Sequence, residues 1–150
     1  MITTPAGLPI TWAPADPKID ERQVLTAVLD HDPALTADRP GLTIIADKGY
    51  VSRELDAYLA ERGIALLRPS YRNRAPHPEE HLLKPVRQLA ESIFDTLKGR
   101  LDLELHGGRS IDGVGVGVRI GQRLLAMTAA ICHNRATGQT DHPLADRLRH

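Results

Sequence analysis

Leu42-Thr43-Ile44-Ile45-Ala46-Asp47-Lys48-Gly49-Tyr50 is the stretch that decides the fold of this 150-residue chain. Its first five residues are almost wholly apolar and rich in β-branched side chains, which favours a buried parallel strand. Asp47 stands where that strand ends. Functional sites in open α/β sheets form at the carboxyl ends of strands, so Asp47 is a candidate site residue. Taken alone, an aspartate at such a place is more often a turn former.

The residues after this stretch predict a βαβ unit. Ser52 can cap a helix that runs to Arg62 with apolar residues at helical spacing, and Gly63 can end it. A second short strand is predicted over Ile64 to Leu67. Since the order is strand, helix, strand, the two strands should pair in parallel through a right-handed crossover. The fold class is therefore predicted to be α/β.

The part of the chain before the stretch predicts a β-hairpin and a helix. Residues 2–13 form the hairpin, with its turn at Pro5-Ala6-Gly7, and Pro9 places the second strand at an edge or at an irregular start. Asp20 is expected to cap a helix that ends near Asp30. Residues 33–40 are predicted to be a loop.

Two long helices are expected further along the chain. The first carries an apolar face opposite a charged face. The apolar face consists of Leu83, Val86, Ala90, Ile93, Phe94, Leu97 and Leu101. The charged face consists of Lys84, Arg87, Glu91, Asp95 and Lys98. The second helix is predicted within Gly113 to Asn134, although its early glycines each cost about 1 kcal/mol relative to alanine. One domain is therefore placed at residues 1–136 and a polar tail at 137–150.

Composition narrows the class of protein. A chain of 150 residues fits a single domain, and only five aromatic residues predict an aliphatic core. A single cysteine, Cys132, excludes an internal disulfide and suits a reducing compartment. The chain has no signal-peptide pattern and no apolar run of about 20 residues that would span a bilayer. We therefore expect a cytoplasmic protein without a membrane partner. The net charge of zero is weak evidence about whether the chain binds a polyanionic partner such as DNA.

Three arginines surround a tyrosine after the second predicted strand. Arg68, Arg72 and Arg74 flank Tyr71. Guanidinium groups beside an aromatic ring can hold phosphates while the ring stacks on a base, which makes this segment a candidate DNA contact. A solvated basic loop is about as good an explanation.

The spacing Arg87-x3-Glu91-x6-Lys98 resembles the signature around the catalytic glutamate of DDE transposases from bacterial insertion sequences. The segment Ile44 to Tyr50 resembles the strand and turn around the second catalytic aspartate of the same family. The resemblance spans Gly7 to about Asn134. It implies an RNase H-like fold, in which a mixed sheet is flanked by helices. Glu91 alone is more often half of an ion pair on a helix face.

The family resemblance implies a function in DNA transposition, through metal-dependent cleavage and transfer of DNA strands. In the complete family site, two aspartates and a glutamate hold two Mg²⁺ or Mn²⁺ ions, and Asp47 and Glu91 would be two of these ligands. Arg87 and Lys98 would contact phosphates of the element's ends and the target. Lys84 stands where the family usually has a tyrosine and is a further DNA-binding candidate.

One part of the family pattern is absent from this sequence. The family's first catalytic aspartate lies on a strand upstream of the hairpin, and neither Asp16 nor Asp20 substitutes for it. We therefore expect an N-terminally truncated fold that is inactive alone and is completed by a missing N-terminal half or in a homo-oligomer. Two alternatives stay open. One is a non-enzymatic remnant that binds DNA or a transposase subunit, and the other is an RNase H-like nuclease completed by another chain.

Overall fold

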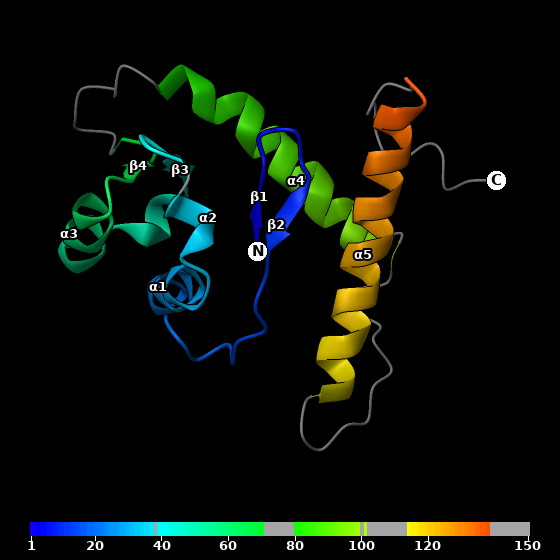
Figure 1. Ribbon diagram of the computed structural model, residues 1–150, viewed down its shortest axis with the longest axis horizontal. Helices are drawn as coiled ribbons and strands as arrows, with labels where there is room; N and C mark the ends of the chain where they lie inside the picture. The colour runs from blue at the N-terminus through cyan, green and yellow to red at the C-terminus, as the bar shows by residue number, and fades with distance from the viewer. Residues whose placement is uncertain (38, 71–79, 100, 102–113, 139–150) are drawn as a thin grey trace. The chain divides into compact units, whose positions relative to one another are not determined.

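The computed structural model describes residues 1–37, 39–70, 80–99, 101 and 114–138. They form a mixed α/β structure, which confirms the predicted class (Figure 1). The chain divides into two compact units, one of residues 12–86 and one of residues 1–11 with 87–150. Each unit contains one two-stranded sheet within the described residues. The predicted mixed sheet thus takes the form of an antiparallel pair and a separate parallel pair.

In the unit of residues 12–86, helix α1 (Glu21–His31) begins where the sequence predicts. The Asp20 carboxylate accepts a hydrogen bond from the backbone N–H of Arg22 at 2.9 Å, which satisfies one of the free donors of the first turn. Leu25 and Leu29, one turn apart, are buried and supply the core side of the helix.

A short helix, α2 (Ala34–Ala37), occupies half of the segment predicted to be a loop, so the prediction for residues 33–40 is wrong there. Pro33 precedes the helix, and its carbonyl accepts hydrogen bonds from the N–H groups of Thr36 and Ala37 at 3.1 and 3.0 Å. Proline breaks a helix interior but suits a helix start, because it has a helical φ and no N–H to satisfy. Pro33, which the sequence pattern predicts as part of a loop, therefore marks the start of a helix.

The central stretch forms strand β3 (Thr43–Ile45), which pairs in parallel with strand β4 (Ala65–Leu67). The ladder continues one residue beyond the strands, since Ala46 N–H donates to the carbonyl of Leu67 at 3.0 Å. Between them lie the 3₁₀ turn η1 (Lys48–Tyr50) and helix α3 (Arg53–Glu61). The order and the parallel pairing of the predicted βαβ unit are confirmed, but the predicted burial of the first strand is wrong, since Thr43 is exposed and Ile44 and Ile45 are half-buried.

Helix α3 has the ends that its sequence predicts, and it is tied to α1. The Ser52 hydroxyl accepts from Leu55 N–H at 3.2 Å, and Gly63 takes a positive φ of 65° where the helix has stopped. Tyr58 donates its hydroxyl to Asp30 at 2.6 Å, and Arg62 donates to the same carboxylate at 3.1 Å. Burial of the Tyr58 hydroxyl, and then its hydrogen bond to Asp30, raise the pKa of Tyr58 to about 12.

The second unit contains the predicted hairpin, strands β1 (Ile2–Thr3) and β2 (Pro9–Thr11), in antiparallel pairing. Gly7 in its turn has a φ of 82° and is buried. A Cβ at Gly7 would lie 3.3 Å from Cδ1 of Ile93, so the turn packs closely on helix α4 (Leu83–Gly99). The short turn η2 (Glu80–Leu82) precedes α4.

Helix α4 and helix α5 (Val114–Ala136) confirm the two long helices, with one correction. Ile93 and Leu97 of α4 are buried, but Phe94 is 49% exposed, although it was predicted to lie on the apolar face. At about 100° per residue it sits at the border of that face, and Thr96 takes a buried place instead. Thr96 satisfies its hydroxyl by donating to the Ser92 carbonyl at 2.9 Å.

The remaining predictions about the chain's organisation are only partly open to inspection. Helix α5 contributes Leu124, Met127 and Ile131 to the core. Most of the predicted polar tail, residues 139–150, lies outside the described residues. No helix in the described part of the chain is both long and apolar enough to cross a membrane.

The packing of α3 predicts a large cost for Leu59→Ala. Leu59 is 1% exposed, so its truncation should lower the free energy of unfolding of this unit by about 2–5 kcal/mol, through lost burial and a residual cavity. Val51→Ala, at a position that is 40% exposed, should change it by no more than about 0.5 kcal/mol. Urea titrations followed by circular dichroism measure both, and equal effects would contradict the described core.

Candidate functional site

Asp47 caps the turn that follows strand β3. Its Oδ1 accepts a hydrogen bond from Gly49 N–H at 2.8 Å, and the side chain is exposed. A Cβ at Gly49 would lie 3.0 Å from the same oxygen, a tight contact that would require the carboxylate to shift by a few tenths of an ångström. Glycine at this position therefore lets the backbone approach the carboxylate. This geometry also agrees with the turn-forming role that aspartates often have.

A second carboxylate, from Glu21, approaches the same turn. Its Oε2 is 3.9 Å from the position that a Gly49 Cβ would occupy. Burial, and then the charges of Glu21, Asp47 and Asp20, raise the pKa of Tyr50 in the same turn. No sequence pattern singles out Glu21, because an acidic residue in the first turn of a helix is explained by the helix dipole alone.

Glu91 lies on the exposed, charged side of α4. Its Oε1 accepts a hydrogen bond from Nε of Arg87 at 2.9 Å, a pair with i,i+4 spacing. Such exposed pairs contribute only about 0.3–0.5 kcal/mol to stability, so the pairing leaves the carboxylate available at little cost. Asp47 and Glu91 belong to different units. Their convergence on one metal site stays a prediction.

Lys84 and Lys98 share the exposed side of α4 with Arg87. On a helix, residues 87, 91 and 98 point within about 40° of one another. Two cationic side chains and one carboxylate therefore face the same direction. Contact of these cations with DNA stays a prediction.

Arg68 is placed beside the Asp47 turn. Its Nη1 donates to the carbonyl of Tyr50 at 2.7 Å, and its Nη2 lies 2.9 Å from Oδ1 of Asp56. The side chain is 19% exposed. The other members of the predicted basic segment, Arg72 and Arg74 with Tyr71, lie outside the described residues.

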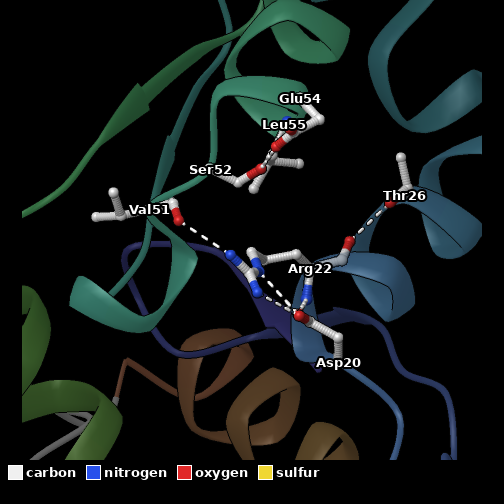
Figure 2. A network of polar contacts seen from close by, with 7 residues as sticks. All are labelled: Asp20, Arg22, Thr26, Val51, Ser52, Glu54 and Leu55. Atoms are coloured by element: carbon white, nitrogen blue, oxygen red, sulfur yellow. Dashed lines mark hydrogen bonds and ion pairs between the residues drawn. The ribbon is translucent and has the colours of Figure 1, made fainter.

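Arg22 contacts the end of the same turn, at Val51 (Figure 2). Its Nη1 donates to the carbonyl of Val51 at 3.0 Å. Its Nε donates to Oδ1 of Asp20 at 2.8 Å, and its Nη2 donates to Oδ2 of the same carboxylate. Asp20, which the sequence predicts only as a helix cap, thus also orients an arginine that reaches the loop leading into α3.

The carboxylates of this unit are of a type that binds metal ions, but the described residues do not bring three of them together. Asp47 and Glu21 offer hard oxygen ligands of the kind that Mg²⁺ prefers. Among the residues that the structure describes, however, no three His, Cys, Asp or Glu side chains are grouped so that they could hold a metal ion.

Comparison of the chain with models of protein families, with curated proteins and with solved structures finds no match. What supports a function is thus the placement of residues on the chain itself. That placement consists of one aspartate at the end of a parallel strand, and a carboxylate flanked by cations on the exposed side of a long helix.

The hydrogen bonds from Arg22 predict an unusual titration of Asp20. They lower the pKa of Asp20 from 3.8 to about 2. A group with a depressed folded-state pKa contributes stability that is present above the unfolded value and is lost as pH falls through the folded value. Stability from this pair should therefore be complete above about pH 4 and should disappear as pH falls through about 2.

Carboxyl ¹³C NMR of Asp20 measures this titration directly. The wild-type midpoint should lie near pH 2, and Arg22→Met should move it towards 3.8 because the donor is gone. Arg62→Met serves as the control, since Arg62 pairs with Asp30 instead. A wild-type midpoint at 3.8 or above would contradict the bonding described for Arg22 and Asp20.

Proposed function

We propose that this chain is the C-terminal part of a DDE transposase of a bacterial insertion sequence, with a truncated RNase H-like fold. In this proposal it takes part in cleavage and transfer of DNA strands only together with a segment that supplies a third carboxylate. The observation that carries the proposal is the position of Asp47. It lies at the carboxyl end of a strand paired in parallel within a βαβ unit, and a glycine and a tyrosine follow it. Sites of open α/β sheets form at such strand ends.

The two separate sheets support a truncated fold. Within the described residues, β3 pairs only with β4, and β1 pairs only with β2, so each sheet has open edges. Sheets of two strands of two or three residues are below the usual size of a stable sheet. An RNase H-like sheet that lacks a central strand would leave both an antiparallel and a parallel fragment, which is the combination found here.

The polar side of α4 supports a role with DNA. Arg87, Glu91 and Lys98 point in nearly the same direction, so a metal ligand would lie between two phosphate contacts. Asp47 and Glu91 would be two of the ligands of the metal ions, which supply electrostatic stabilisation of the reacting phosphate when they are bound. Lys84 on the same helix, and Arg72 and Arg74 of the predicted basic segment, are the further DNA contacts of the proposal, whereas the guanidinium of Arg68 is bound to Tyr50 and Asp56.

The incomplete set of carboxylates favours a second candidate function. A remnant that binds DNA or a transposase subunit, without catalysis, needs no metal site, and no group of three ligands is found in the described residues. A nuclease completed by another chain is the third reading. It would cleave DNA regardless of whether the ends of an insertion element are present.

The proposal predicts that the chain is inactive alone and active when it is complemented. The purified 150-residue chain should show no Mg²⁺-dependent nicking of a supercoiled plasmid that carries the element's ends, because a ligand is missing. Adding the polypeptide encoded immediately upstream should restore cleavage. Asp47→Asn and Glu91→Gln should each abolish it, by removing a charge while keeping the shape. Asp95→Asn, one turn from Glu91 on the same helix, is the matched control and should remain active.

The other outcomes of the plasmid assay distinguish the alternative functions from one another. Binding of the plasmid without cleavage after complementation would favour the remnant. Cleavage that does not depend on the element's ends would favour the nuclease. Metal-dependent cleavage by the chain alone, lost in both variants, would show that the third carboxylate is already present.

A further inference from the structure

We propose that Arg22 and Arg68 are positioning residues that clamp the turn carrying Asp47. The two guanidinium groups donate to the carbonyls of consecutive residues, Arg68 to Tyr50 at 2.7 Å and Arg22 to Val51 at 3.0 Å. Arg22 comes from the first turn of α1, and Arg68 directly follows β4. Two elements distant in sequence thus hold the same short segment.

Each arginine is itself held by an aspartate. Asp20 accepts from both Nε and Nη2 of Arg22 (Figure 2). Asp56 lies 2.9 Å from Nη2 of Arg68. A guanidinium is planar and presents its donors in a rigid fork, so pairing one side with a carboxylate fixes the direction of the other donors. The aspartates therefore orient the arginines towards the two carbonyls.

The turn needs such external bonds because its internal ones are long. Tyr50 N–H reaches the Asp47 carbonyl at 3.4 Å, and Val51 N–H reaches the Lys48 carbonyl at the same distance. Both exceed the usual 2.7–3.2 Å of a protein N–H···O bond, whereas the two arginine bonds fall within it. The two arginines thus add bonds of ordinary length to a turn whose own backbone bonds are long. Asp47 is coupled to the turn by its bond from Gly49 N–H at 2.8 Å.

The clamp assigns Arg68 a role that differs from DNA contact. A guanidinium whose donors go to Tyr50 and Asp56 acts on the reaction only through the position of Asp47. This functional part of the inference rests on the proposed role of Asp47 as a metal ligand. The mechanical part, that the two arginines hold the turn, does not depend on it.

Hydrogen–deuterium exchange of the full 150-residue chain, read by mass spectrometry, tests the mechanical part. Arg22→Met and Arg68→Met should each speed the exchange of amides in residues 48–51 about tenfold, because a bond from a charged donor is lost. Arg62→Met is the matched control. It removes an arginine–aspartate pair and an arginine–carbonyl bond of the same kind on α3, and it should leave residues 48–51 unchanged.

Lysine variants separate the clamp from a general loss of stability. Arg22→Lys and Arg68→Lys keep a charged donor group without the planar fork, so exchange in residues 48–51 should lie between wild type and the methionine variants. Should the methionine variants fail to fold, the lysine variants decide alone. Faster exchange confined to residues 48–51 supports the clamp. Wild-type exchange in both folded arginine variants overturns it.

The complemented enzyme of the plasmid assay tests the functional part. Both methionine variants should lower kcat while the Kd for DNA stays unchanged, and lysine should restore part of kcat. A weaker, more salt-sensitive DNA affinity in Arg68→Met at normal kcat would instead mean that Arg68 contacts phosphates, and would overturn its place in the clamp. If the complemented wild type does not cleave, the proposed function fails, and the exchange measurement still decides the clamp.

Discussion

The parallel ladder between β3 and β4 is the interaction on which the rest of this structure depends. It is only three residue pairs long, from Thr43↔Ala65 to Ile45↔Leu67, so it cannot persist without support from side chains. Helix α3 contacts β4, and its buried residues Leu55 and Leu59 supply aliphatic packing to this unit. The unit of residues 12–86 is thus held by aliphatic packing around a minimal sheet.

The same ladder determines where the polar chemistry of this unit gathers. Once β3 ends, the chain turns through η1, and Asp47, Gly49 and Tyr50 follow at the sheet edge. The first turn of α1 and the residue after β4 lie against this turn, as the bonds from Arg22 and Arg68 show. A carboxylate is thereby held on a turn anchored from two sides. Rigid support of this kind is what a ligand or a catalytic group requires.

Local patterns predicted most of the fold. The caps at Asp20 and Ser52 and the stop at Gly63 depend on neighbouring residues only, and these helix ends agree with prediction. Phe94 was misplaced because helical spacing puts it at the border of the apolar face. Tertiary packing, not spacing, decides whether a residue at that border is buried. The short helix α2 was missed because proline signals both the end and the start of a helix.

The contacts of the candidate site could not be predicted in the same way. Arg68 meets Tyr50 across 18 positions and Arg22 meets Val51 across 29, and no periodicity reports such pairs. For the same reason the sequence pattern places Arg68 in a basic segment and does not single out Glu21. Tertiary contacts of long side chains depend on the fold, so they appear only with it.

The proposed function requires Asp47 and Glu91 to meet in one metal site, which is a prediction because the two residues belong to different units. The most direct measurement is thiol cross-linking of Asp47→Cys with Glu91→Cys in a Cys132→Ser background, using a short rigid reagent. The pair with Ser92→Cys, about 100° further around the helix, is the control. We expect an intramolecular cross-link in the Glu91 pair and little in the Ser92 pair. Equal or absent cross-linking in both pairs would contradict this prediction, because ligands that share a metal ion must lie together.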